Sequence, residues 1–296
     1  MIEVTNLRKA YGALKAVDGI SFAISAGETF GLLGPNGAGK TTTLHMLTGA
    51  LKPDAGTIAI NGQHDPTQVE VRRQIGLAPQ SLALYEALTG EENLSFFCKL
   101  YGFAGAKLKE RVQYALELAG LTDRRRDRVD TYSGGMKRRL NLACAIVHEP
   151  MVLFLDEPTV GVDPQSRNYL FDTIEALAKQ GRTIIYTTHY MEEAQRLCQR
   201  VAIMDHGKIL ALDTVPGLVA QHGGQAMVDV ELAEPPANVG SLPAPLDGKR
   251  LRYASAKPHE EIQRLAALDL KLTRFAIDQP NLEKVFLNLT GRSLRD

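Results

Sequence analysis

The sequence predicts an α/β protein built on a largely parallel sheet, followed by a second, smaller domain. Over the first part of the chain, short apolar runs that are typical of strands alternate with stretches of helical periodicity, an order typical of parallel sheets. Near residue 222 this order gives way to strands in which apolar and charged residues alternate. A length of 296 residues also corresponds to about two domains.

The composition is that of a folded globular protein, with 44% hydrophobic and 23% charged residues. Because 34 basic residues balance 34 acidic ones, binding to naked nucleic acid through overall charge is not expected. The longest apolar run, residues 142–147, is far shorter than the about 20 residues of a membrane span. The start of the chain lacks the apolar stretch of a secretory signal, and the three cysteines are widely spaced, so we expect a cytoplasmic protein.

Local patterns define the elements of the first domain, which we assign to residues 1–221. Apolar runs between turns predict strands at Ile2–Leu7, Ser21–Ile24, Thr29–Leu33, Met151–Leu155, Thr183–Thr187 and Arg200–Met204, and a hairpin around Thr57–Asn61. Helical periodicity predicts helices at Thr41–Leu47, through much of 86–147, after Asp163, and between the last two strands.

The second domain, residues 222–296, is predicted to be a small α+β unit. Strands are expected at Val228–Leu232, around Leu251 and Tyr253, and near Lys271–Ile277, with a helix near His259–Leu268. A last helix is predicted with Asp278 as its cap, Pro280 in its first turn, and an apolar stripe from Leu282 to Leu289. Regulation, dimerisation and simple covering of the small domain remain open as its roles.

A glycine-rich segment between a predicted strand and a predicted helix indicates nucleotide binding. Residues 34–41, GPNGAGKT, satisfy the pattern G-x-x-x-x-G-K-[ST]. Glycines allow successive backbone N–H groups to close around phosphate oxygens, and the helix N-terminus favours an anion. The ammonium group of Lys40 suits the β- and γ-phosphates, and the Thr41 hydroxyl suits Mg²⁺.

Polar residues follow two of the buried strands. Asp156 and Glu157 come directly after one strand, where carboxylates are costly to bury unless a cation lies nearby. Next to a phosphate loop that cation is Mg²⁺ at Asp156, and Glu157 is then placed to orient or deprotonate the attacking water. His189 follows a second strand, and because parallel strands end at the same edge it could bond the γ-phosphate.

A second candidate anion site precedes the helical run 137–146. In the segment YSGGM, residues 132–136, Ser133 with Gly134 and Gly135 forms either an ordinary helix cap or a phosphate-binding nest. As a nest, it would serve the nucleotide held by another copy of the chain. The basic run Lys137–Arg139 that follows is either a solvated helix face or a contact to phosphate or a partner.

Together these motifs resemble the ATP-binding cassette (ABC) ATPases over about residues 2–220. GPNGAGKT is similar to the Walker A loop, LAPQ to the Q-loop, YSGGM to the signature, MVLFLDE to Walker B and Gly161–Asp163 to the D-loop. The resemblance implies a RecA-like P-loop NTPase core with an antiparallel β subdomain and a helical subdomain over about residues 86–147.

The resemblance also implies roles for individual residues. The implied nucleotide-binding residues are Tyr11, Gly34, Pro35, Asn36, Gly37, Ala38, Gly39, Lys40, Thr41 and Thr42, with Ser133, Gly134, Gly135 and Asp163 facing the nucleotide of the partner. Tyr11 would stack on adenine, with core packing as the alternative. The implied catalytic residues are Glu157, His189 and Gln80, and the implied Mg²⁺ ligands are Thr41, Gln80 and Asp156.

Members of this family close as head-to-tail dimers around two MgATP, which implies a second cassette. Since every motif residue is present here, a homodimer is the simplest choice.

Met136 stands where glutamine is common, and YSGGMKRR with PNLEKVFLNLTGR (280–292) resembles the drug-resistance and nodulation-factor-export branch. That branch implies a transport-coupled ATPase, an exporter, on the inner face of the membrane with an ABC-2 type permease. Tyr85 and Glu86 are expected nearest the groove that receives the permease.

The alternative is an ABC ATPase outside transport. Translation factors of the family usually carry two cassettes in one chain, whereas one set of motifs occurs here. DNA-repair members carry a long coiled-coil insertion between Walker A and the signature, and the segment between Lys40 and Ser133 has no sustained heptads. Both observations favour the transport interpretation.

Overall fold

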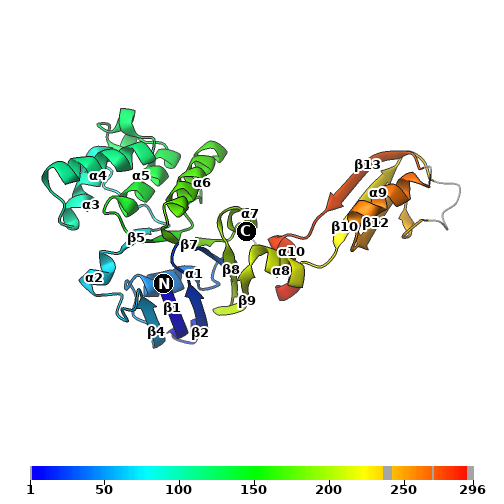
Figure 1. The fold of residues 1–296 in the computed structure, drawn as a ribbon, viewed down its shortest axis with the longest axis horizontal. Coiled ribbons are helices and arrows are strands. Elements are labelled where there is room, and N and C mark those ends of the chain that lie inside the picture. The colour runs from blue at the N-terminus through cyan, green and yellow to red at the C-terminus, as the bar shows by residue number, and fades with distance from the viewer. Residues whose placement is uncertain (1, 236–241, 269, 292–296) are drawn as a thin grey trace. The chain divides into compact units, whose positions relative to one another are not determined.

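The computed structural model describes residues 2–235, 242–268 and 270–291. The chain forms two compact units, one that extends to Val215 and a second that begins at Pro216, before the expected boundary at 222. In Figure 1 the first unit carries the blue-to-green part of the chain and the second carries mainly the yellow-to-red part. Each unit has its own sheets and its own buried hydrophobic cluster.

A six-stranded sheet forms the centre of the first unit, in the order β5-β6-β7-β3-β8-β9. Its strands are β3 (Thr29–Leu33), β5 (Ile75–Ala78), β6 (Val152–Asp156), β7 (Thr183–Thr188), β8 (Arg200–Asp205) and β9 (Lys208–Thr214). All neighbours pair in parallel except β9, which is antiparallel to β8. Because β3, β6 and β7 are buried along their whole length, the sheet is covered on both faces. The predicted parallel α/β core is confirmed.

A three-stranded antiparallel sheet packs onto this core. Its strands, in the order β2-β1-β4, are β1 (Ile2–Tyr11), β2 (Leu14–Ile24) and β4 (Ala55–Ile60). The inward side chains of both sheets and of helix α1 (Lys40–Leu47) form one buried cluster, in which the rings of Phe22 and Phe30 stack 5.3 Å apart. This shared core fixes the start of α1, and with it Lys40, against the sheet edge.

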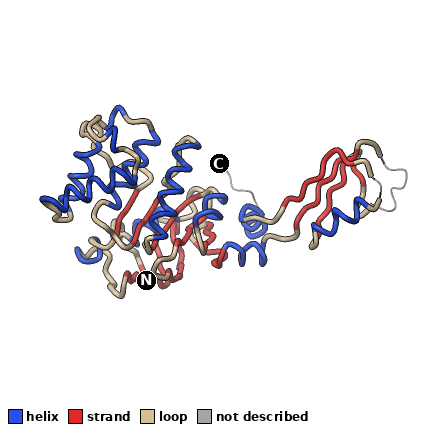
Figure 2. Tube along the Cα trace, turned by 45° about the horizontal axis from the view of Figure 1, so that its top comes forward, coloured by secondary structure: helices blue, strands red, loops and turns tan. Residues whose placement is uncertain are grey.

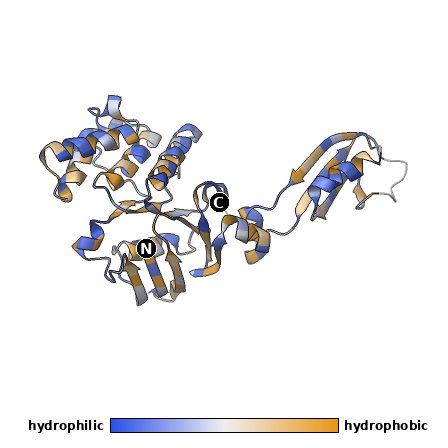
Figure 3. Ribbon diagram, in the orientation of Figure 1, coloured by the Kyte–Doolittle hydropathy of each residue, from blue (hydrophilic) through white to orange (hydrophobic). Residues whose placement is uncertain are grey.

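The segment predicted to be helical forms a subdomain of three α-helices, α3 (Gly90–Leu100), α4 (Gly105–Leu118) and α5 (Gly134–Ile146), with two short 3₁₀ helices between α4 and α5. Its buried cluster includes Leu94, Leu116 and Leu140. Helix α3 begins at a capping box, in which the Thr89 side chain accepts a hydrogen bond from Glu92 N and the Glu92 side chain accepts one from Thr89 N. Hydrophobic and hydrophilic residues alternate along these helices (Figure 3), as expected for helices with one buried face.

Three further helices connect the strands of the first unit: α2 (Val69–Arg72), α6 (Pro164–Lys179) and α7 (Met191–Leu197). Asp163 caps α6, where its Oδ1 accepts a hydrogen bond from Ser166 N at 2.9 Å, and Pro164 is the first helical residue, as predicted. Figure 2 shows α6 and the helical subdomain as helical segments beside the red strands. Within the described residues, none of the helices combines the length and apolar character needed to cross a membrane.

The hairpin expected around Thr57–Asn61 is reduced to its turn. Strand β4 pairs with β1 and ends at Ile60, and Asn61 and Gly62 then turn with positive φ. Ile60 and Gln63 exchange two backbone hydrogen bonds, yet only an isolated bridge forms. The Asn-Gly pair is a strong turn signal, but the residues after it do not continue as a strand.

Among its described residues, the second unit contains a four-stranded antiparallel sheet and three helices, the first of which begins one residue before the unit itself, at Val215. The strands, in the order β11-β12-β10-β13, are β10 (Ala226–Leu232), β11 (Leu246–Asp247), β12 (Arg250–Ser255) and β13 (Leu272–Asp278), and the helices are α8 (Val215–His222), α9 (Pro258–Ala266) and α10 (Leu282–Thr290). Alternate residues of β10 are buried in a cluster with Leu251 and Leu265, which explains the predicted alternation.

The start of the last helix differs from the prediction. Asn281, and not Asp278, caps α10, since its Oδ1 accepts a hydrogen bond from Lys284 N at 3.0 Å. Asp278 instead ends β13, where it pairs with Met227, so Pro280 lies before the helix. An Asp-x-Pro sequence alone does not tell where a paired strand ends.

Candidate functional site

The glycine-rich segment forms a tight loop between β3 and α1. Gly37 and Gly39 have φ values of 82° and 102°, a region that side chains other than glycine rarely adopt. A Cβ on Gly39 would lie 2.3 Å from Ala16 O, and one on Gly34 would lie 2.2 Å from Met204 O. Both glycines are therefore required by the packing of the loop, and the strand–loop–helix order predicted for nucleotide binding is present.

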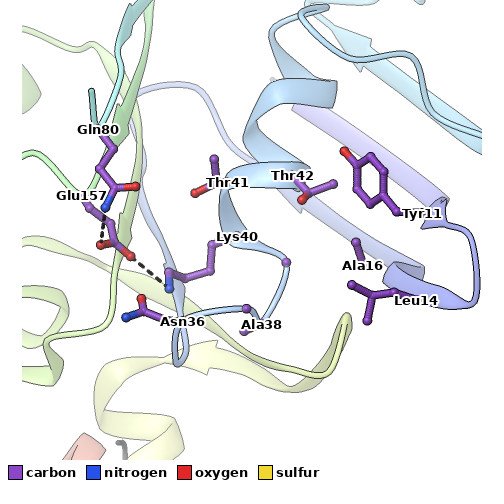
Figure 4. Close-up of a pocket in the computed structure, with 12 residues that line it drawn as sticks. Tyr11, Leu14, Ala16, Asn36, Ala38, Lys40, Thr41, Thr42, Gln80 and Glu157 are labelled. Carbon is purple, nitrogen blue, oxygen red and sulfur yellow. Dashed lines mark hydrogen bonds and ion pairs between the residues drawn. The ribbon is translucent and has the colours of Figure 1, made fainter. Parts of the chain in front are cut away.

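Lys40, the first residue of α1, is held among oxygen atoms. Its Nζ donates hydrogen bonds to Gly34 O at 2.8 Å and to Pro35 O at 3.1 Å, and lies 3.1 Å from Glu157 Oε1 (Figure 4). The Lys40 side chain is only 4% exposed, so it depends on these acceptors for its charge. They form the kind of oxygen-rich environment that a phosphate would replace.

Glu157 is the centre of the polar cluster. It follows β6 with φ 44°, a strained conformation for a residue other than glycine. Thr187 holds its backbone, because Glu157 N donates to Thr187 O at 3.2 Å and to Thr187 Oγ1 at 3.0 Å. Glu157 Oε2 lies 3.4 Å from Gln80 Nε2 and 3.2 Å from His189 Nδ1. The ends of β5, β6 and β7 thus bring the predicted residues Gln80, Glu157 and His189 together.

Two of the predicted metal ligands, Thr41 and Asp156, are in contact, and the third, Gln80, lines the same cavity as Thr41. Asp156 Oδ1 accepts hydrogen bonds from Thr41 Oγ1 at 3.2 Å and from Thr187 Oγ1 at 2.6 Å. Among the described residues, no group of three or more His, Cys, Asp or Glu side chains could hold a metal ion. A hydroxyl, one carboxylate and a nearby amide fit Mg²⁺, which protein sites bind through few carboxylates together with substrate phosphates.

A cavity of about 440 Å³ extends along the loop. Figure 4 shows Tyr11 and Leu14 at one end and Gln80 and Glu157 at the other, with Lys40, Thr41 and Thr42 between them. The complete lining is Tyr11, Leu14, Ala16, Asn36, Gly37, Ala38, Gly39, Lys40, Thr41, Thr42, Gln80 and Glu157. Tyr11 is 52% exposed, so core packing does not explain it. Leu14 and Ala16 were missed, although they follow Tyr11 across the β1–β2 turn.

The second candidate anion site lies at the N-terminus of α5. Ser133 caps the helix and its Oγ accepts a hydrogen bond from Met136 N at 3.2 Å. A Cβ on Gly135 would lie 2.1 Å from Ser166 Oγ and 3.1 Å from Asp163 Oδ2, whereas one on Gly134 would meet no atom within 4 Å. Ser133–Gly135 and Asp163 are therefore neighbours, but they are not among the residues that line the cavity beside Lys40.

A buried carboxylate that the sequence analysis missed lies next to the segments that carry Glu157 and His189. Glu193, on α7, is 3% exposed. Its carboxylate accepts hydrogen bonds from Thr159 Oγ1 at 2.7 Å, Tyr186 OH at 2.9 Å and Thr188 Oγ1 at 2.7 Å. Burial raises the pKa of the Tyr186 hydroxyl well above its usual value, and the charge of Glu193 adds to this shift, so the hydroxyl remains a donor. The network joins the segments that carry Glu157 and His189.

The comparison with known proteins agrees with this geometry. Residues 17–160 match the family described as "ABC transporter". The chain is 40% identical to the Linearmycin resistance ATP-binding protein LnrL of Bacillus subtilis (strain 168), with 100% of both chains covered. It is 42% identical to the Nod factor export ATP-binding protein I of Paraburkholderia xenovorans (strain LB400), with 100% of this chain and 98% of that protein covered.

The chain belongs to the ABC transporter family. A solved structure described as "Structure of ATP binding subunit of ABC transporter" is similar, with a TM-score of 0.68 and 32% identity over 75% of this chain and 93% of that one. As a member of the ABC family, the chain is an ATP-binding, ATP-hydrolysing P-loop enzyme, and the cavity beside Lys40 has the composition that ATP requires. The RecA-like core and the helical and antiparallel subdomains are those of an ABC cassette.

Proposed function

We propose that this ABC protein is the ATPase subunit of an exporter and drives a separate ABC-2 type permease from the cytoplasmic face of the membrane. The names of the Linearmycin resistance and Nod factor export relatives, which match over the full chain, support export. In this proposal the cassette spans residues 1–221, and residues 222–296 form an accessory domain.

The observation that carries the proposal is the contact between Lys40 and Glu157, whose charged atoms lie 3.1 Å apart inside the cavity. Phosphate oxygens are better acceptors for an ammonium group than the Gly34 and Pro35 carbonyls that Lys40 now contacts. When ATP enters, Lys40 turns to the β- and γ-phosphates. Glu157 is then released to accept a proton from water.

Three residues support hydrolysis in distinct ways. Glu157 orients the attacking water and accepts its proton. His189, 3.2 Å from Glu157 Oε2, donates a hydrogen bond to the γ-phosphate, and Gln80 positions the water from the other side. Tyr11 stacks on adenine at the far end of the cavity, while the backbone of Gly34–Thr42 holds the phosphates.

Thr41, Asp156 and Gln80 would hold Mg²⁺. The hydrogen bond between Thr41 Oγ1 and Asp156 Oδ1 already brings two of these oxygen atoms within 3.2 Å of one another. When bound, the ion neutralises the charge that develops on the phosphate oxygens. Thr187 keeps the Asp156 carboxylate in place through its hydrogen bond of 2.6 Å.

The active assembly in this proposal is a head-to-tail homodimer that encloses two MgATP. Each chain offers a cavity at Lys40 and, apart from it, the N-terminus of α5 at Ser133–Gly135, where Ser133 and Gly134 are exposed and Asp163 lies alongside. A second copy supplies the missing half of each site. ATP bound from both sides favours the closed dimer, and loss of phosphate favours opening, which is a shift in population that can move a permease.

An exposed aromatic cluster on the helical subdomain is proposed to contact the permease. Tyr85 and Phe96 are 49% and 38% exposed, and their rings meet edge to face at 4.9 Å. Glu86, beside them, forms an ion pair with Lys137 at 2.6 Å. Exposed aromatic residues with a polar rim are typical of protein interfaces.

The proposal is tested with the Glu157→Gln variant, which keeps the size of the side chain but cannot accept the proton of water. With ATP and Mg²⁺ the variant should form a stable dimer, whereas the wild type dimerises only until ATP is hydrolysed, as measured by light scattering and phosphate release. A variant that hydrolyses ATP at the wild-type rate would contradict the role of Glu157. A variant that stays monomeric, where the wild type dimerises, would contradict the two-sided site.

A further inference from the structure

The three basic residues that follow the signature segment on α5 all contact their own chain. Lys137 Nζ lies 2.6 Å from Glu86 Oε1. The Arg139 guanidinium donates to Ala119 O at 2.8 Å and lies 4.8 Å above the Tyr169 ring. Arg138, between them, is the one whose partners lie beside the nucleotide cavity.

Arg138 joins two backbone segments that are far apart in the sequence. Its Nη1 donates a hydrogen bond to Gln80 O, and its Nη2 donates one to Val160 O at 3.1 Å. A guanidinium is planar, permanently charged and carries donors at fixed angles, so it holds the two carbonyl groups at a defined separation. Lysine, with a single ammonium group, does not reproduce this geometry.

Each of these segments also contacts Glu157. The side chain of Gln80 reaches it, with Nε2 3.4 Å from Glu157 Oε2. The backbone of Val160 reaches it as well, because Val160 N donates to Glu157 O at 3.3 Å. Arg138 therefore contacts both neighbours of Glu157 but has no hydrogen bond or ion pair with Glu157 itself among the described residues.

A second side chain on the same face of α5 strengthens this connection. Asn141, one turn after Arg138, is 4% exposed. Its Oδ1 accepts a hydrogen bond from Ala83 N, and its Nδ2 donates one to Pro79 O, both at 3.2 Å. Helix α5 thus holds the segment that carries Gln80 at three points, so a shift of the helix moves that segment with it.

We propose that Arg138 is a positioning residue that makes the geometry around Glu157 depend on the position of α5. The inference rests on the proposed role of Glu157 in hydrolysis. The N-terminus of α5 carries Ser133–Gly135, so whatever binds there acts on a rigid helix whose next turn holds the Gln80 and Val160 carbonyls. Hydrolysis is then fast only while α5 occupies the position that its N-terminal ligand favours.

The test compares Arg138→Met and Arg138→Lys with a matched control, Arg182→Met, in the full chain. Arg182 also donates to a backbone carbonyl, Pro150 O at 2.6 Å, but directly precedes β7 and so lies at the end of that strand opposite His189. We measure kcat and KM for ATP hydrolysis, the Kd for ATP and the thermal midpoint. Arg138→Met should lower kcat by about tenfold or more while KM and Kd change by less than about threefold, and Arg138→Lys should fall between it and the wild type.

The control should lose a similar amount of thermal stability but keep kcat within about twofold of the wild type. A double-mutant cycle with Gln80→Ala completes the test, since two residues that act through one segment should be non-additive in kcat. The inference would be overturned if Arg138→Met kept the wild-type kcat, or if Arg182→Met lost as much kcat as Arg138→Met. Additive effects of Arg138→Met and Gln80→Ala on kcat would also overturn it. If Glu157→Gln itself keeps full turnover, the proposed function of Glu157 fails first; if that variant is inactive and Arg138→Met is normal, only this inference fails.

Discussion

Lys40 Nζ and Glu157 Oε1 lie 3.1 Å apart, and their side chains are 4% and 5% exposed. A cation from the phosphate loop thus pairs with a carboxylate at the end of β6. Buried charges of this kind are stable only while both partners are present, because each side chain has lost its contact with water. The pair therefore links the stability of the fold at this site to the chemistry that ATP binding brings about.

Replacement of Lys40 by alanine should abolish turnover and weaken ATP binding by at least about tenfold, because the charge that meets the β- and γ-phosphates is lost. Without nucleotide, the same change should lower the free energy of unfolding by about 3 kcal/mol, since Glu157 remains buried without its cation. Urea unfolding and isothermal titration calorimetry measure the two effects.

Lys40→Ala has two controls. Lys107→Ala removes an exposed ion pair with Glu110 and should change neither quantity measurably. The double variant Lys40→Ala/Glu157→Ala should recover part of the lost stability, because the unpaired carboxylate is gone as well. If Lys40→Ala hydrolyses ATP normally, the assignment of the phosphate loop is wrong.

Tyr11 is expected to bind adenine through its ring and not through its hydroxyl. Tyr11→Phe should keep the affinity for ATP, whereas Tyr11→Ala should raise the Kd about tenfold, the range measured for stacking of a base on an aromatic side chain. Because Tyr11 is 52% exposed at the end of β1, neither change should alter the thermal midpoint. Equal Kd values for Tyr11→Ala and the wild type would show that adenine lies elsewhere.

Several residues of the nucleotide site could be predicted from the sequence because they lie where an element begins or ends. Lys40 begins α1, Asp156 ends β6, and His189 directly follows β7. The carboxyl ends of parallel strands lie at one edge of the sheet. The strand pattern was therefore enough to predict that residues distant in the sequence are close in space. Gln80 was assigned to the site only through the family resemblance, since nothing in its own segment distinguishes it, and the structure places its Nε2 3.4 Å from Glu157 Oε2.

Other features could not be predicted, for a physical reason. Glu193 bonds hydroxyl groups and Arg138 bonds backbone carbonyls, and such partners leave no pattern in the sequence. The start of α10 was placed too early because Asp278 and Asn281 are both good caps, and only the pairing of β13 with β10 decides between them. The hairpin after β4 ended at its turn because no partner strand follows Gln63.

The variant Gly134→Ala distinguishes ATP binding by a single chain from ATP-dependent dimerisation of two chains. A Cβ at this position meets no atom within 4 Å, and alanine is the better helix former, so the thermal midpoint and the ATP affinity of the single chain should be unchanged. In the proposed dimer the added methyl group would occupy the place of the partner's γ-phosphate. ATP-dependent dimerisation in the Glu157→Gln background should therefore be lost in light scattering. Dimerisation with unchanged ATP dependence would argue against a phosphate at Ser133–Gly135.

His148 should make the free energy of unfolding of the first unit depend on pH in the acid range. Burial lowers the pKa of His148 to about 4, and the charges of Arg182 and Arg111 add to the shift. Its ring stacks on Tyr101 at 3.6 Å and its Nε2 lies 2.9 Å from Ile75 O. In the unfolded chain the pKa is about 6.5, so between the two values the unfolded state binds more protons.

The full contribution of His148 to the free energy of unfolding is therefore present above about pH 6.5. It decreases by up to about 3 kcal/mol as the pH falls toward 4. The variant His148→Phe keeps an aromatic ring on Tyr101 but cannot be protonated. Its free energy of unfolding should therefore fall less steeply over this pH interval. The loss of the hydrogen bond to Ile75 O should lower that free energy by the same amount at every pH. His64→Gln, at an exposed position, should retain the wild-type slope. Urea unfolding at several pH values gives the slopes, and parallel curves for the wild type and His148→Phe would mean that His148 is not the group whose protonation destabilises the fold.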